Sequence, residues 1–263
     1  DSPDRPLNQL FVNSDYSKIN IPIFQRPYSW EAIQLDQFLN DVDAVYNRFE
    51  SSEEEHFIGL IVYVPNAIDR KQIDVIDGQQ RITTCSIFLS VIKDYLHAFV
   101  VNQNTLTDPE KQSLTRVSTR CEDKILNEYN SAFLPKLSTE NEKKYENEFL
   151  EIIQKGLDQF EENHIVKSTY NGQPENEKNI YKAKINYFKS NPPFDQRTAK
   201  SKNSLKNYES IYTHISDKLE GKSDSRKFEI LRKYFQVITE RIKYIPFEIE
   251  SYEKAFLYFE VLN

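Results

Sequence analysis

The chain has 263 residues, enough for one large domain or two small ones, and its 38% hydrophobic and 29% charged residues support a buried core beneath a polar surface. The net charge of −7 argues against a dedicated DNA-binding domain, since such domains are usually basic. No run of eighteen apolar residues is present and the two cysteines give no disulfide framework, so we expect no membrane span and a cytoplasmic location.

The first fifty residues predict one strand and one helix. Residues 1–20 are expected to form only a short lead-in. The alternation over 19–24 then predicts a strand, broken by a proline at its edge or start. After a proline-containing loop, Ser29 is expected to cap an amphipathic helix that runs to Phe49, because apolar residues recur there at helical spacing.

Two strands and a long helix follow. Residues 56–64 form an apolar run that is stopped by Pro65, and a second short strand is predicted over 73–76. A polar turn occupies 77–81. Apolar residues at helical spacing then predict a helix over 82–99. The order of strand, glycine-containing turn and helix is the best-defined part of the pattern.

The middle of the chain differs in character, because it is polar, rich in Asn and Lys, and helical in periodicity. Apolar stripes at helical spacing lie at 149–160, 205–215 and 228–238, and 189–204 is expected to be a linker. A strand at 244–249 and a helix capped by Ser251 close the chain. We therefore predict a mostly helical α/β fold of the α+β type in three parts: a core at 1–101, a helical lobe or insertion at 102–240, and a return to the core at 241–263.

The turn Asp77-Gly78-Gln79-Gln80-Arg81 is the strongest candidate site, because a strand delivers it to a helix N-terminus. Unpaired backbone N–H groups and the helix dipole favour a phosphate group at such a position. Gly78 would let the backbone approach a ligand, and Arg81 can bind phosphate oxygens in a bidentate manner. Asp77 could hold Mg²⁺ or accept a proton.

The neighbouring side chains add donors to this turn. Gln79 and Gln80 could orient a water molecule or hold a sugar or base, and Thr83 and Thr84 could add hydroxyl donors. The alternative is an ordinary capped turn with a solvated arginine. The motif is neither a Walker A sequence nor a dinucleotide-binding fingerprint.

A second candidate lies at residues 24–30, again between a strand and a helix start. Arg26 is a second phosphate ligand candidate, while Tyr28 and Trp30, the only tryptophan of the chain, could stack on a base or sense DNA. The alternative is a rigid proline turn with its rings in the core. The four histidines are scattered, so we assign no metal ligands and no metal-nuclease centre to this chain.

Four segments in the same order resemble the GmrSD N-terminal domain family. They are Ile-Pro-Ile-Phe-Gln-Arg-Pro-Tyr-Ser-Trp at 21–30, Phe-Ile-Gly-Leu-Ile-Val at 57–62, Val-Ile-Asp-Gly-Gln-Gln-Arg-Ile-Thr-Thr at 75–84, and the final twelve residues at 252–263. The chain stops at the Leu-Asn pair that this family normally continues with an Arg- and Gly-containing stretch.

The resemblance implies a ParB/sulfiredoxin-like core with a mixed sheet and an enzyme that binds and hydrolyses a nucleoside triphosphate such as GTP, ATP or CTP, with Mg²⁺. It implies that residues 77–81 form the nucleotide site and that Gln25, Arg26 and Tyr28 line the same cleft. It also implies modified foreign DNA as a target, and an HNH-type nuclease domain in the full-length protein or on a partner chain. A homo-oligomer is a further possible assembly.

These observations lead to one hypothesis with two alternatives. The hypothesis is a regulatory NTPase of a modification-dependent restriction system, in which Asp77 or Gln80 positions the attacking water and Arg81 and Arg26 neutralise phosphates. The first alternative is a module that senses modified DNA without hydrolysis. The second is an antitoxin-like or scaffolding protein with a relic cleft.

Overall fold

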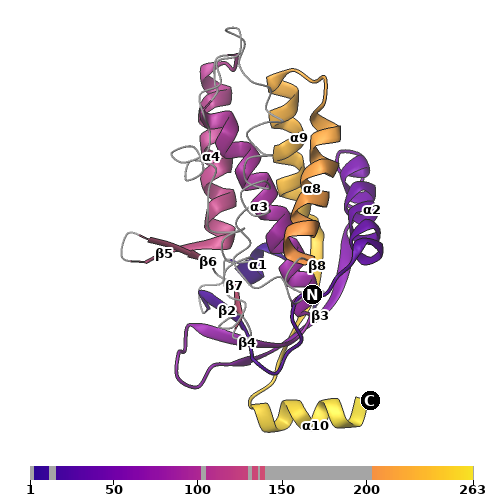
Figure 1. Cartoon of the computed structure of the whole chain (residues 1–263), viewed down its shortest axis with the longest axis vertical. Coiled ribbons are helices and arrows are strands. Elements are labelled where there is room, and N and C mark those ends of the chain that lie inside the picture. The colour runs from indigo at the N-terminus through magenta and orange to yellow at the C-terminus, as the bar shows by residue number, and fades with distance from the viewer. Residues whose placement is uncertain are drawn as a thin grey trace.

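The computed structural model describes residues 3–11, 16–101, 105–129, 132–135, 137–139 and 203–262. A six-stranded mixed sheet packs against long helices, which confirms the predicted α+β class (Figure 1). The predicted helix at 149–160 and most of the linker at 189–204 lie outside the described residues.

The sheet has the strand order β1-β8-β3-β4-β2-β7. Its strands are β1 (Arg5–Pro6), β2 (Lys18–Ile21), β3 (His56–Pro65), β4 (Gln72–Asp77), β7 (Leu137–Thr139) and β8 (Ile242–Glu248). β4, β2 and β7 run parallel to one another, β3 and β8 also form a parallel pair, and β3 pairs antiparallel with β4. Two further strands, β5 (Leu126–Tyr129) and β6 (Ala132–Pro135), form a separate antiparallel pair.

The helices divide between the two faces of the sheet. They are α1 (Asn8–Phe11), α2 (Ala32–Arg48), α3 (Gln79–Val101), α4 (Asp108–Ile125), α8 (Asn203–Leu219), α9 (Asp224–Gln236), a π-helix (Val237–Arg241) and α10 (Tyr252–Leu262). In Figure 1, α2, α3, α4, α8 and α9 stand together above the sheet, while α10 lies alone below it. A large core joins the upper helices to the sheet, and a small one joins α10 to it.

The alternation along β4 shows why the sheet has two apolar faces. Successive side chains of a strand point to opposite faces. Ile73 and Val75 belong to the core beneath the upper helices, whereas Ile76 belongs to the small core with Ala255 of α10. The two faces of β4 therefore pack against different helices, the upper helices on one face and α10 on the other.

Four expectations from the sequence need correction. The lead-in is structured, since β1 and α1 lie there and Leu7 is fully buried. The first strand ends at Ile21, because Pro22 cannot donate to a ladder. Glu31 caps α2 in place of Ser29, and it forms a capping box with Gln34. The lobe also contains strands, and β7 joins the main sheet through β2.

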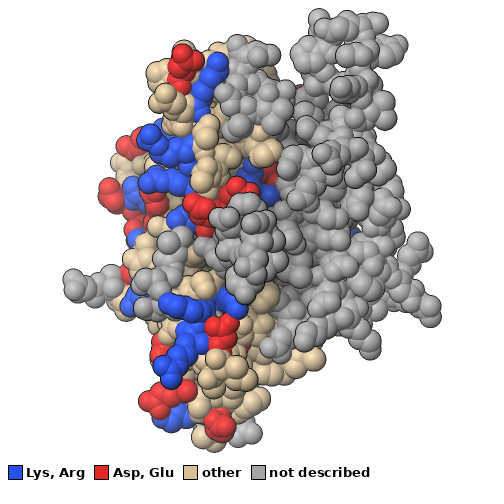
Figure 2. Space-filling model, turned by 90° about the vertical axis from the view of Figure 1, so that its left-hand side faces the viewer, with Lys and Arg blue, Asp and Glu red and all other residues tan. Residues whose placement is uncertain are grey.

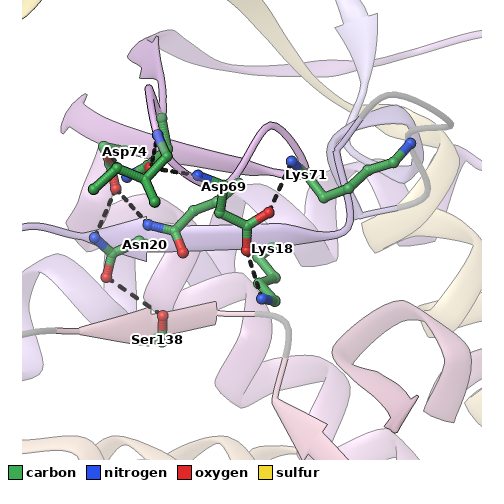
Figure 3. Close-up of polar contacts among 9 residues, drawn as sticks. Lys18, Asn20, Asp69, Lys71, Asp74 and Ser138 are labelled. Carbon is green, nitrogen blue, oxygen red and sulfur yellow. Dashed lines mark hydrogen bonds and ion pairs between the residues drawn. The ribbon is translucent and has the colours of Figure 1, made fainter.

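A polar network holds β2 beside β4. Figure 3 shows the buried carboxylate of Asp74, which accepts hydrogen bonds from Asn20 Nδ2 at 2.7 Å, Asn66 Nδ2 at 2.7 Å and Gln72 Nε2 at 2.9 Å. Asn20 Oδ1 in turn accepts from the hydroxyl of Ser138 on β7. Because a buried carboxylate needs such donors, the network favours one register of these parallel strands.

A second carboxylate, Asp43 of α2, joins three helices. It accepts hydrogen bonds from His214 Nε2 at 3.1 Å, Lys218 Nζ at 2.6 Å and the Tyr234 hydroxyl at 2.7 Å. Burial alone would raise the pKa of Asp43, but these hydrogen bonds outweigh burial and lower it to about 2. The ionised carboxylate therefore stabilises the contact of α2 with α8 and α9.

This lowered pKa predicts an acid-dependent stability. A carboxyl group whose pKa falls on folding stabilises the protein above its unfolded pKa, and that contribution disappears as the pH drops from about 4 to about 2. Asp43→Asn should cost about 1 kcal/mol at pH 6, after allowing for solvent screening, and almost nothing at pH 2. Urea unfolding of parent and variant across this range measures the difference, with the exposed Asp36→Asn as the control. A pH-independent difference would contradict the assignment.

Candidate functional site at the carboxyl ends of β2 and β4

A cavity of about 440 Å³ opens where β2 and β4 end. Its volume lies in the range of small-molecule sites. Its lining comes from the loop after β2, the end of β4, the glycine that follows it, the start of α3 and helix α10: Phe24, Gln25, Arg26, Trp30, Ile76, Asp77, Gly78, Gln79, Gln80, Arg81, Tyr252, Ala255 and Phe256. Most residues that the sequence marked as site candidates therefore line one space.

The topology explains why the two motifs meet. β2 and β4 are parallel neighbours, with Ile19 opposite Ile73, so their carboxyl ends reach the same edge of the sheet. Each strand then leads through a turn into a helix. Such an edge of an α/β sheet is a common place for ligands, because loops and helix N-termini converge there.

Hydrogen bonds join the first motif to the second. Gln25 Nε2 donates to the carbonyl of Ile76 at 2.8 Å. Gln80 Oε1 accepts from the backbone N–H of Ser29 at 2.8 Å, and Gln80 Nε2 donates to the carbonyl of Pro27 at 3.2 Å. Both ends of the Gln80 amide thus hold the loop after β2, and the two motifs form one structural unit.

Three predicted nucleotide ligands lie outside the cavity lining: Tyr28, Thr83 and Thr84. The Tyr28 hydroxyl lies 2.8 Å from Thr84 Oγ1 and accepts a hydrogen bond from Asn207 of α8. Burial raises the pKa of Tyr28 to about 12 despite these hydrogen bonds, so the hydroxyl stays neutral. Thr83 and Thr84 are buried in α3. Tyr28 and Thr84 therefore support the site from within the protein.

Gly78 is required by packing against the protein itself. Its φ of 93° is a left-handed conformation that glycine adopts without strain. A Cβ atom there would overlap the side chain of Ile61 and lie 3.0 Å from the carbonyl oxygen of Leu60. Close approach to β3 is therefore one reason for a glycine here, and because Gly78 also lines the cavity, the expected close approach to a ligand stays a prediction.

Two arginines and one carboxylate supply the charge of the described lining. Arg26 is exposed and forms no ion pair within the described part of the chain. Arg81 donates from Nη1 to the carbonyl of Ile58, and its Nη2 lies 3.3 Å from Asp77 Oδ2. Asp77 is exposed at the cavity. Two positive charges against one negative charge favour an anionic ligand.

The start of α3 offers further groups to a ligand. No described group accepts from the backbone N–H of Gln79 or Gln80, as is usual for the first turn of a helix. Gln79 is only 7% exposed, yet its Oε1 has no hydrogen-bond partner among the described residues. An unpaired buried polar atom costs about 1–3 kcal/mol, so a ligand that bonds it would recover that energy.

The contribution of α10 to the cavity lining was not predicted from the sequence. Phe24 packs edge-on against Tyr252 at 5.9 Å between ring centroids, and Phe256 lies at the same distance. These rings form an aromatic wall in the cavity lining that also holds the two arginines, and Trp30 adds another ring. The only signal was the spacing of Tyr252 and Phe256, which places them on one face of the last helix.

The chain matches the family described as GmrSD restriction endonuclease, N-terminal domain, over residues 7–263. It belongs to this family. The GmrSD N-terminal domain is a component of a type IV restriction system, and membership implies DNA as the target and a nuclease part in the full-length protein. No curated protein matches the chain. Within the described residues, no helix of this domain combines the length and apolar character that crossing a membrane requires.

Proposed function

We propose that this GmrSD N-terminal domain binds a nucleoside triphosphate, hydrolyses it slowly, and thereby regulates cleavage of modified foreign DNA by an HNH-type nuclease part. The observation that carries the proposal is the cavity itself. It combines an unpartnered helix N-terminus, two arginines and an aromatic wall within about 440 Å³. Phosphates need the first two features, and a base needs the third.

The phosphate end of the ligand would lie at the start of α3. Arg26 and Arg81 neutralise its charge, and the backbone N–H groups that follow Gly78 donate to its oxygens. Asp77 is the acidic residue of the described lining, so it is the group that would position the attacking water. Gln80 was the other candidate for this role, but its amide already binds the backbone of Pro27 and Ser29.

A magnesium ion that arrives with the nucleotide fits this lining. Mg²⁺ in such sites usually takes one or two carboxylates together with phosphate oxygens and water. Asp77 supplies one exposed carboxylate at the cavity. When bound, the ion would offset charge on the phosphates, while Arg26 and Arg81 would hold the nucleotide in place.

The base would lie against the aromatic wall of Phe24, Tyr252 and Phe256. Stacking on rings tolerates every base, so the wall does not by itself select among GTP, ATP and CTP. Gln79 also lines the cavity, and its Oε1, which has no partner among the described residues, can accept from an amine of a base or a hydroxyl of the ribose.

Arg81→Ala tests the proposal. We expect parent protein with Mg²⁺ to release phosphate from at least one of ATP, GTP, CTP and UTP, with or without DNA. The variant should lose about tenfold to a hundredfold of that rate, because a charged hydrogen bond to phosphate is removed. The matched control is Arg116→Ala, which removes an exposed arginine of α4 outside the cavity.

Two outcomes would overturn the proposal. If Arg81→Ala and the parent release phosphate equally, hydrolysis does not take place at residues 77–81. If the parent neither releases phosphate nor binds nucleotide in calorimetry, that result would favour the alternative, a module that senses modified DNA through Trp30. Figure 2 shows acidic and basic side chains interspersed over the described residues of one face, so DNA sensing would depend on specific contacts.

A further inference from the structure

We propose that Gly59 of β3 is a positioning residue for Arg81, a role that rests on the proposed function. Gly59 stands 22 positions from Arg81 and outside the cavity lining, in an apolar run that otherwise indicates a plain strand. Glycine inside a strand often marks a bulge or the close approach of another group. In this domain both occur at the same residue.

The backbone of β3 is irregular at this glycine. The register of β3 against β8 shifts between Phe57 and Leu60, and Gly59 has a φ of 99°. The shift turns the carbonyl of the preceding residue, Ile58, toward α3, where it accepts a hydrogen bond from Arg81 Nη1. The guanidinium of Arg81 therefore rests against the strand at a point where the ladder is interrupted.

The missing side chain of Gly59 makes room for that guanidinium. A Cβ atom at Gly59 would overlap Arg81 Nη1 and would lie 3.3 Å from Arg81 Cζ. Any other residue would therefore displace the guanidinium, and it would also be strained at this positive φ. We call the space beside Gly59, with the Ile58 carbonyl, the arginine seat.

The arginine seat is important because, among the described residues, the Arg81 guanidinium has only one other polar contact, with Asp77. Its ion pair with Asp77 is a 3.3 Å contact between partly exposed groups, and such pairs order a side chain weakly. A free arginine loses considerable rotamer entropy when it binds a ligand. The seat fixes one edge of the guanidinium and so orients the remaining N–H donors toward the cavity. Less conformational entropy is then lost when a phosphate binds there.

Gly221 offers a matched control. It also has a positive φ, 69°, so Gly221→Ala introduces backbone strain too, although less than at Gly59, because φ 69° lies in the left-handed region that L residues can adopt. No atom of the described residues lies within 4 Å of the position that its Cβ would occupy, and Gly221 lies in the turn between α8 and α9, away from the cavity lining. Gly221→Ala therefore controls for a glycine replacement at positive φ without a close neighbour, and the double variant with Arg81→Ala separates the contact with Arg81 from the backbone strain at Gly59.

The experiment compares Gly59→Ala, Arg81→Ala, the double variant and Gly221→Ala with the parent. Binding of Mg²⁺ with ATP, GTP or CTP is followed by calorimetry and by the fluorescence of Trp30, the single tryptophan, which lines the cavity. We expect Gly59→Ala to weaken binding about tenfold to a hundredfold, as Arg81→Ala does, and the double variant to lose no more. Gly221→Ala should bind within about twofold of the parent. Parent-like binding by Gly59→Ala, or additive losses in the double variant, would overturn the inference.

Unfolding separates this inference from the proposed function. Should the parent bind no nucleotide, the proposed function fails, yet the seat can still be tested by urea midpoints of the same variants. The strain at φ 99° is present in both backgrounds, whereas the overlap with the guanidinium exists only with Arg81. Gly59→Ala should therefore lower the midpoint less in the Arg81→Ala background than in the parent. Equal losses in the two backgrounds would show that no seat exists.

Discussion

Replacing Asp94 with Asn is expected to lower the free energy of unfolding by about 3–5 kcal/mol, the largest effect that we foresee. Asp94 of α3 is 1% exposed, and the ammonium of Lys93 lies 3.1 Å from its Oδ1 as an ion pair. Its Oδ2 accepts a hydrogen bond from the Tyr208 hydroxyl at 2.5 Å. The substitution would leave the buried Lys93 without a carboxylate partner among the described residues.

The same network predicts how the loss can be repaired. Burial and the neighbouring Asp94 raise the pKa of Tyr208 well above its ordinary value, so its hydroxyl stays a donor that needs an acceptor. Adding Lys93→Met to Asp94→Asn removes the unpaired charge and should recover much of the stability. Urea unfolding measures each variant, and Asp217→Asn on the exposed side of α8 is the control. A loss below about 1 kcal/mol would contradict the buried ion pair.

Asp74→Asn should cost about 2–3 kcal/mol and should weaken the sheet at β2. The described donors to this buried carboxylate are the side-chain amides of Asn20, Asn66 and Gln72 (Figure 3). A carboxamide has one acceptor oxygen in place of two, and its NH₂ group would face another donor. At least one of these buried or partly buried amides would then lose its partner, and repulsion between donors would add to that cost.

The measurement for Asp74→Asn has two parts. Urea unfolding gives the loss of stability, with Asp36→Asn on the exposed face of α2 as the control. Hydrogen exchange then locates the loss, and we expect faster exchange of the amides in β2 and β4 than in α9, because Asn20 and Asp74 of these strands form the centre of the network and α9 contributes no residue to the hydrogen bonds named. Stability equal to that of the parent would show that the carboxylate is dispensable.

The turn between β4 and α3 could be predicted because its signals are local. An apolar strand, a glycine and a long apolar helix follow one another within 30 residues, and each has its own periodicity. The meeting of residues 77–81 with Gln25 and Arg26 came only from the family resemblance, and the structure brings them to one cavity. The likeness to ParB and sulfiredoxin, the three-part domain division and the roles of the site residues stay predictions.

The parts that escaped prediction depend on long-range contacts or on short elements. β7 has three residues, too few for alternation to be recognised, and it lies in a polar segment. The partners of Gln80 and Tyr28 come from residues at least 50 positions away. Gly59 did carry a local signal, an interruption of an apolar strand, but the arginine that fills the space could be found only in three dimensions.

The placement of α10 has a consequence for biosynthesis. The cavity lining includes both Phe24 and Phe256, so its aromatic wall joins residues that lie more than 200 positions apart in the sequence. A chain emerging from the ribosome can form the β4–α3 turn early, but it cannot enclose a ligand until α10 has left the exit tunnel. Contacts of such long range also form late in folding. A chain shortened before α10 would therefore present the arginines without the rings of Tyr252 and Phe256, and the proposed ligand binding would begin only after α10 has left the exit tunnel.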